Sequence, residues 1–122
     1  MVAFPENVEE LINDSLFRIG YDKVVSQRIN IVITKLDSLK SLRGKDYKTT
    51  KKIKRYYIHN VIKPELDSLY YIVTEKKRPV FFQIIRLLND NKTVLSSSRG
   101  QPTLESNKHI DQIIKTVKQL QD

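Results

Sequence analysis

The chain has 122 residues, of which 39% are hydrophobic, 8% aromatic and 30% charged. This composition is typical of one soluble globular domain and excludes a disordered chain. The absence of cysteine excludes disulfides, thiolate zinc sites and thiol nucleophiles. No apolar run reaches the roughly 20 residues of a membrane span. The acidic N-terminal stretch does not resemble a secretory signal, so we expect an intracellular protein without membrane contact.

The formal net charge of +8 is concentrated in one segment. Residues 1–42 carry five basic and six acidic side chains, which gives −1. Residues 43–63 carry eight basic side chains and one acidic, which gives +7, and residues 64–122 carry nine and seven, which gives +2. The basicity is therefore a local feature.

Helical periodicity predicts an all-α fold, a compact bundle of about five helices that forms a single domain over residues 1–122. The first helix has an apolar side at 4-4-3 spacing, made of Val8, Ile12, Leu16 and Ile19. We expect Gly20 to end this helix as a left-handed cap.

The second helix is predicted to run from near Asp22 to about Leu42. Its apolar row has the 4-3-4-3 spacing of a coiled-coil seam. The row consists of Val25, Ile29, Val32, Leu36 and Leu39. Either the last helix of this chain or a second chain can fill the seam, and packing within the chain is the simpler alternative.

The third helix is predicted to begin at an Asp46 cap, with Ile53, Tyr57 and Val61 on its apolar stripe. Helical spacing continues across Pro64, so the helix either kinks there or ends, and we favour a kink. A fourth helix starts at Pro79. Residues 92–103 are predicted to form one long mobile loop without a strand pair, before a last helix over roughly 104–121.

Residues 11–25 carry a motif-like pattern. Leu11-Ile12, Leu16 and Gly20-Tyr21 reproduce the spacing of the LisH motif, in which Leu-Ile, two residues, Tyr-Leu and three residues precede Gly-Tyr. Ser15 replaces the first tyrosine of that motif, and its downstream acidic residue is absent. The stretch nevertheless resembles a LisH-like dimerisation motif. The resemblance implies self-association, or assembly with a protein partner, through Leu11, Ile12, Leu16, Gly20, Tyr21 and Val25.

The order Gly20-Tyr21-Asp22 also resembles an element of the small helical subunit of the COMPASS histone-methylation complex. The alternative to both resemblances is an ordinary helix cap at Gly20 followed by an ordinary core aromatic at Tyr21. Both alternatives bury Leu11, Leu16 and Tyr21, and they differ in what covers these side chains.

The basic segment is the strongest charge feature. On a helix, Lys48, Lys51, Lys52 and Arg55 share a face that could follow a phosphate backbone. Tyr56 could stack on an unpaired base. The candidate nucleic-acid-binding residues are Arg43, Lys45, Lys48, Lys51, Lys52, Lys54, Arg55 and Tyr56. The same lysines also fit a solvated surface, a nuclear import signal or docking to an acidic protein.

The residues that catalysis needs do not stand at a useful spacing. His59 has no second histidine or carboxylate three or four residues away, and His109 has only Glu105. The three glycines lie far apart, so the sequence has no phosphate-binding loop. We expect no enzyme, no catalytic or metal-binding residue, no cofactor and no small-molecule substrate.

The expected function is a non-catalytic assembly subunit of a larger intracellular complex, with a nuclear location compatible with the basic segment. Its third helix would contact nucleic acid or chromatin. The alternative is a nucleic-acid-binding protein proper, in which the basic third helix is the phosphate-contacting surface.

Overall fold

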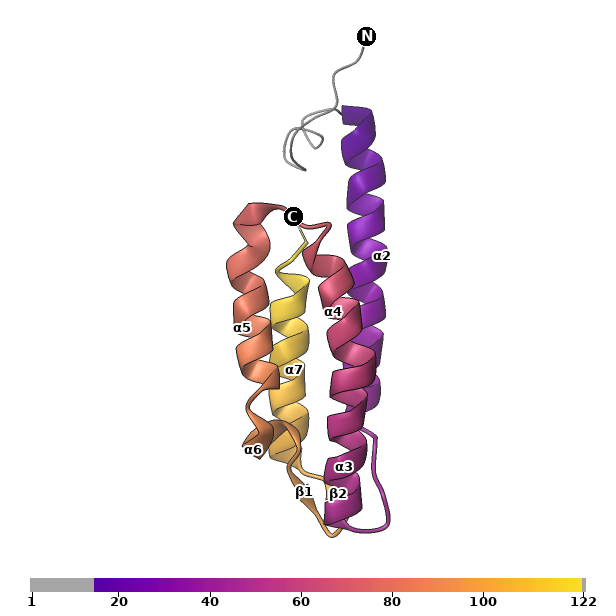
Figure 1. Cartoon of the computed structure of the whole chain (residues 1–122), viewed down its shortest axis with the longest axis vertical. Coiled ribbons are helices and arrows are strands. Elements are labelled where there is room, and N and C mark those ends of the chain that lie inside the picture. Colours follow the sequence, from indigo (N-terminus) through magenta and orange to yellow (C-terminus); the bar gives the residue numbers. More distant parts are fainter. Residues whose placement is uncertain (1–14, 122) are drawn as a thin grey trace.

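The computed structural model describes residues 15–121, with side chains from residue 19 onward. Four helical rods lie alongside one another (Figure 1). They are α2 (Ser15–Leu39), the unbroken run of α3 (Tyr47–Tyr57), π-helical η1 (Ile58–Ile62) and α4 (Lys63–Tyr70), then α5 (Arg78–Leu88) and α7 (Leu104–Lys118). The short elements are a 3-10 turn η2 (Glu75–Lys77), α6 (Asn91–Val94), β1 (Ser97–Ser98) and β2 (Gln101–Pro102). The predicted all-α bundle is confirmed.

The core lies where α2 meets α7 and α4. Every residue of the predicted α2 row is at most 5% exposed. The facing row of α7 is at most 2% exposed and consists of Ile110, Ile113, Val117 and Leu120. Burial of each such side chain stabilises the fold by about 1.5–3 kcal/mol. The helix of the same chain therefore fills the seam, as the simpler alternative predicts.

The predicted helix end at Gly20 is wrong, because α2 continues through this residue without interruption. Gly20 does not have a positive φ angle, whereas Gly100 does. Downstream, the hydroxyl of Tyr21 donates a hydrogen bond to the carbonyl of Ile72 and Val25 enters the core. These contacts and the backbone hydrogen bonds of a continuous helix outweigh the roughly 1 kcal/mol that glycine costs inside a helix.

The chain also stays helical across Pro64. Proline has no N–H and normally breaks the hydrogen-bond ladder of a helix. Here the ladder shifts just before the proline, since the Lys63 N–H donates to the Ile58 carbonyl, five residues back, in η1. A π-helical turn of this kind accommodates the missing donor. The predicted alternative of two separate helices is therefore wrong.

The expectation of a long loop without a strand pair over residues 92–103 is wrong as well. Asp90 caps α6 by accepting the Thr93 N–H, and Val94 and Leu95 are 0% and 2% exposed in the core. The two strands then pair in antiparallel register, Ser97 with Pro102 and Ser98 with Gln101. We call residues 97–102 the hairpin. Within residues 15–121, no helix is both long and apolar enough to span a membrane.

Alanine substitutions at Gly20 and at Gly44 should change the free energy of unfolding in opposite directions. A Cβ at Gly20 would meet nothing within 4 Å, so Gly20→Ala should raise the free energy of unfolding by about 0.5–1 kcal/mol. A Cβ at Gly44 would lie 2.5 Å from Thr49 Cγ2, so Gly44→Ala should lower it by about 1–3 kcal/mol. Urea unfolding measures both. A loss of stability in Gly20→Ala would contradict the continuous helix.

Candidate nucleic-acid interface

Helix α3 is positioned at its first turn by an aspartate cap. The Asp46 carboxylate accepts the Thr49 N–H at 2.7 Å, as the sequence predicts for this residue. The hydrogen bond from the Thr49 backbone holds the pKa of Asp46 below its ordinary value, because it stabilises the ionised form. The negative cap also suits the positive end of the helix dipole.

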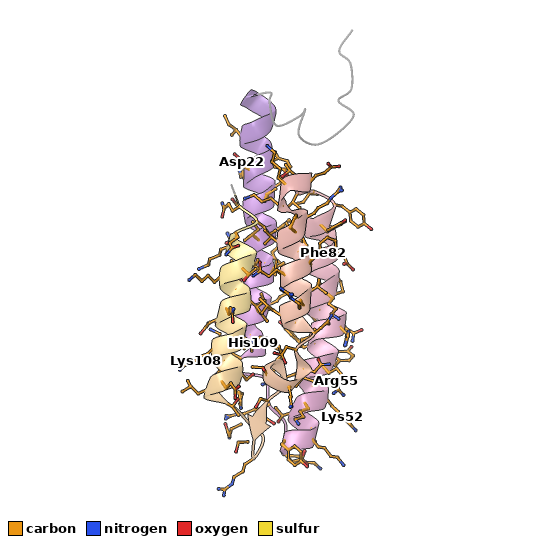
Figure 2. All side chains as sticks on the ribbon, turned by 90° about the vertical axis from the view of Figure 1, so that its left-hand side faces the viewer. Asp22, Lys52, Arg55, Phe82, Lys108 and His109 are labelled. Carbon is orange, nitrogen blue, oxygen red and sulfur yellow. The ribbon has the colours of Figure 1, made fainter. Side chains whose placement is uncertain are left out.

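The rotation of α3 decides which of its side chains reach solvent. Thr50, Lys54 and Ile58 are at most 3% exposed and form its inward row, while the predicted stripe of Ile53, Tyr57 and Val61 is only half-buried. The opposite side is exposed and carries Lys48, Lys52, Arg55 and Tyr56. Figure 2 shows Lys52 and Arg55 pointing away from the bundle. Tyr56 is 67% exposed, which leaves its ring free to stack.

Lys54 was predicted to belong to the nucleic-acid interface, and the structure places it in the interior instead. Its side chain is 0% exposed, and its ammonium donates to the Ser96 carbonyl and to Ser106 Oγ, each at 3.2 Å. Ser106 Oγ in turn donates to the Val94 carbonyl at 2.9 Å. Burial lowers the pKa of Lys54, since no carboxylate of the described residues lies within 4 Å of it to offset desolvation. Lys54 cannot contact a phosphate, and it joins α3 to the chain around α6 and to α7 instead.

The hairpin packs against the start of α3 and brings a further cation to the same end of the bundle. Thr50 Oγ1 accepts the Gly44 N–H, and its single proton lies between two acceptors, the Asp46 carbonyl at 2.8 Å and the Gly100 carbonyl at 3.1 Å. Arg43 Nη1 donates to Gln101 Oε1 on β2. Figure 1 places the hairpin beside the first turns of α3. Arg99, at the tip of the hairpin, therefore lies at this end too.

Arg99 is the residue that sequence reasoning missed. Its φ angle is 53°, and that of Gly100 is 78°. Two consecutive positive φ values define the tight turn of a two-residue hairpin, in which Asn-Gly is the usual pair. Arginine at this position is uncommon and costs of the order of 1 kcal/mol. The available signal was the glycine after Arg99, which marks a turn between two short polar strands.

We define the basic end as seven exposed or half-exposed cations from the α2–α3 connection, α3 and the hairpin. They are Arg43, Lys45, Lys48, Lys51, Lys52, Arg55 and Arg99. Asp46 is the acidic residue among them, so the local formal charge is +6, from seven cations and one carboxylate. Lys51 lies over the Tyr47 ring, with Nζ 5.6 Å from the centroid.

Several cations elsewhere on the described chain, among them Arg28, Lys35 and Lys40, are paired with acids. Glu65 lies within 3.9 Å of Arg28 and 3.8 Å of Lys35. Lys40 contacts Asp111, and this hydrogen bond raises the pKa of Lys40. No cation of the basic end has a carboxylate within 4 Å among residues 15–121. The basic end thus gathers seven cations without a carboxylate of the described residues within 4 Å at one end of the bundle.

The basic residues of η2 do not extend this surface. Lys76 and Lys77 precede α5, which begins at the end of the bundle opposite the first turn of α3 (Figure 1). Arg78 is paired with Glu75 at 3.5 Å and lies 5.5 Å from the Tyr70 ring centroid. The η2 cluster is therefore a separate surface feature.

The two histidines lie on different helices and differ in exposure. His59 is exposed on η1, and His109 is half-buried, with Nε2 2.8 Å from the Leu87 carbonyl on α5. Figure 2 shows His109 on α7, on the side away from Lys108. No group of three histidine, aspartate or glutamate side chains suited to a metal ion occurs in the described part of the chain.

Only part of the predicted protein-interaction residues lies in the described chain. Leu11 and Ile12 lie outside the described residues, as does the side chain of Leu16. Gly20 is exposed, and Tyr21 is half-buried through its hydrogen bond to Ile72. Val25 is 5% exposed in the core of its own chain, so its predicted role in contacting a partner is wrong.

No protein-family model, curated protein or solved structure matches this chain. The functional interpretation therefore rests on the chemistry of its surface.

The buried amine makes stability depend on pH. Below the lowered pKa, folding carries the cost of a desolvated ammonium, and this cost disappears as pH rises towards 10.5, the ordinary pKa of lysine. Lys54→Met removes this cost but also the donor to the Ser96 carbonyl, so the two effects oppose each other near neutral pH. Any gain over wild type should shrink as pH rises, because wild type then becomes more stable and the variant does not. Urea unfolding across this range measures the difference from wild type. Lys52→Met on the exposed side is the control, and a gain independent of pH would contradict a buried charged amine.

Proposed function

We propose that this chain is a non-catalytic nucleic-acid-binding protein whose basic end contacts the phosphate backbone. The observation that carries the proposal is the gathering of seven cations without a carboxylate partner, from three separate segments of the described chain. Unpaired cations at one end of a small domain create a positive potential that attracts a polyanion.

The outward row of α3 has a length suited to phosphates. Lys48 and Arg55 are seven residues apart, which corresponds to about 10 Å along the helix axis. A strand of a nucleic-acid duplex presents one phosphate per 3.4 Å of axis, so this row could follow roughly three phosphates. Arg43 and Arg99 add contacts on either side of the first turn.

The chemistry of the cations favours backbone contact over base reading. The basic end contains four lysines and three arginines, and one of the arginines, Arg43, already donates to Gln101. Specific reading of guanine usually uses arginine in two-pronged geometry, whereas lysine acts as a point charge on phosphate. We therefore expect binding with little sequence preference and a strong dependence on salt.

The strained turn supports the same proposal. Arg99 occupies a left-handed conformation that asparagine or glycine would adopt at lower cost. Residues kept in such conformations often serve function at the expense of stability. At the tip of the hairpin, a guanidinium extends the positive surface beyond the end of α3.

Binding to nucleic acid can be tested by fluorescence anisotropy with a short duplex and a single strand. We expect micromolar binding at about 50 mM salt that weakens by about a thousandfold at about 200 mM, the dependence for about six phosphate contacts. Lys52→Ala with Arg55→Ala should weaken binding to all sequences alike. It should also reduce the slope of log K against log salt by about 2, or about 1 for each lost contact.

The matched control is Lys108→Ala with Lys115→Ala on α7. Both residues are exposed, and the variant removes the same two charges; Figure 2 shows Lys108 on the side of the bundle away from Lys52 and Arg55. An equal loss in both variants would mean that only net charge matters. No binding at low salt would contradict the proposal, and a purified protein that binds nothing while the lysines change its location in cells would indicate an import signal.

A further inference from the structure

The side of α2 that faces away from the bundle carries a row of exposed, uncharged residues. Val24 is 48% exposed and Ile31 is 37% exposed. The row has 4-3-4-3-4 spacing and consists of Gly20, Val24, Gln27, Ile31, Thr34 and Ser38, all of them exposed. We call it the outer row of α2. It lies opposite the core row, because the two sets differ by about half a turn at 100° per residue.

Nothing in the described chain covers the outer row. The main contacts of α2 are with α7, α4 and η1, which all lie on its core side. Figure 1 shows α2 along one flank of the bundle, with its first turns extending beyond the neighbouring helices. A solvated helix face normally carries charges, and 30% of this chain is charged, yet six consecutive outer positions carry none.

We propose that a second copy of this chain packs along the outer row, with the two α2 helices antiparallel. Spacing of this type is the seam of a two-stranded helix pair. In the antiparallel arrangement each Val24 faces Thr34 of the other copy, and each Ile31 faces Gln27. Gly20 faces Ser38, so the backbones can approach closely at both ends.

The charges beside the outer row select the antiparallel orientation. Lys23 and Asp37 flank the row on one side, and Arg28 and Lys35 flank it on the other. Antiparallel pairing brings Lys23 of each copy next to Asp37 of the other, which forms two attractive contacts. Parallel pairing would bring Lys23 next to Arg28 of the other copy, and both side chains are positive. Arg28 also meets its own equivalent near the antiparallel centre, and in each copy the Glu65 carboxylate of the same chain lies 3.9 Å from Arg28.

The basic ends give a second reason for this orientation. They lie next to the C-terminal end of α2 (Figure 1). Antiparallel pairing places them at opposite ends of the dimer, because Leu39 of one copy lies level with Ile19 of the other, so the two C-terminal ends of α2 are about 30 Å apart. This separation exceeds the Debye length of about 8 Å at physiological salt. A parallel dimer would hold two surfaces of charge +6 side by side.

Such a dimer goes beyond the proposed function, because two basic ends that face in opposite directions could bridge two segments of nucleic acid. Dimer formation itself does not depend on nucleic-acid binding, so the two proposals fail separately. One helix pair is smaller than a standard interface of about 1,600 Å², and we expect a dissociation constant in the micromolar range.

Sedimentation equilibrium of the full chain tests the interface. Wild type should reach twice its 14.3 kDa mass at high protein concentration. Val24→Glu with Ile31→Glu should remain monomeric over the same concentrations, with unchanged circular dichroism, since both side chains are exposed. The control is Tyr71→Glu with Phe82→Glu, which places the same charges on side chains that are 79% and 66% exposed elsewhere. The proposal would be overturned by a monomeric wild type, or by a Val24→Glu with Ile31→Glu variant that still forms a dimer.

Charge reversal at Lys23 tests the orientation. In the antiparallel dimer, Lys23→Asp would place two like charges together at both ends and weaken dimerisation by about three- to tenfold. The double variant Lys23→Asp with Asp37→Lys restores both pairs and should restore the affinity. In a parallel dimer, Lys23→Asp would instead face Arg28 and strengthen association. That result would overturn the antiparallel arrangement.

Discussion

The buried polar contacts of Thr50 and Lys54 determine how α3 is rotated, and the charged surface depends on that rotation. Thr50 Oγ1 accepts the Gly44 N–H of the α2–α3 connection and lies within hydrogen-bond distance of the Gly100 carbonyl. The Lys54 ammonium donates to the Ser96 carbonyl and to Ser106 Oγ. An unpaired buried donor would cost a few kcal/mol, so each of these groups needs its partner in place. The side of α3 that meets these partners faces inward, and its remaining cations must face solvent.

This constraint also explains why the positive charge gathers at one end. The contacts of Thr50 and Arg43 hold the hairpin against the first turn of α3, and Arg99 comes with it. Along α2 the cations are partly neutralised from neighbouring helices, since Glu65 of α4 pairs with Arg28 and Lys35 and Asp111 of α7 pairs with Lys40. The single acid at the basic end, Asp46, is already used to cap α3. The result is a surface on which no cation has a carboxylate of the described residues within 4 Å.

Periodicity predicted the helices well because each buries one apolar side. The core rows of α2 and α7 and the Asp46 cap were all evident from spacing and residue type. Gly20 and residues 92–103 were misinterpreted because local preference opposed a structure that long-range packing imposes, through Tyr21 and buried Val94. Lys54 could not be recognised as buried, since its partners lie 42 and 52 residues away. At the candidate site, the cations of α3 were predicted from the sequence. Arg99 was not, because only the pairing of β1 with β2 brings it to the same end of the bundle.

The most direct test of the basic end is a nuclear magnetic resonance titration of the isotopically labelled chain with a short DNA duplex. We predict that the largest amide shifts fall in residues 43–56 and 97–101, in fast exchange, and that added salt reverses them. Shifts that fall mainly on α5 or α7 would contradict this assignment. So would an unchanged spectrum at low salt, which would leave the basic end without a nucleic-acid ligand.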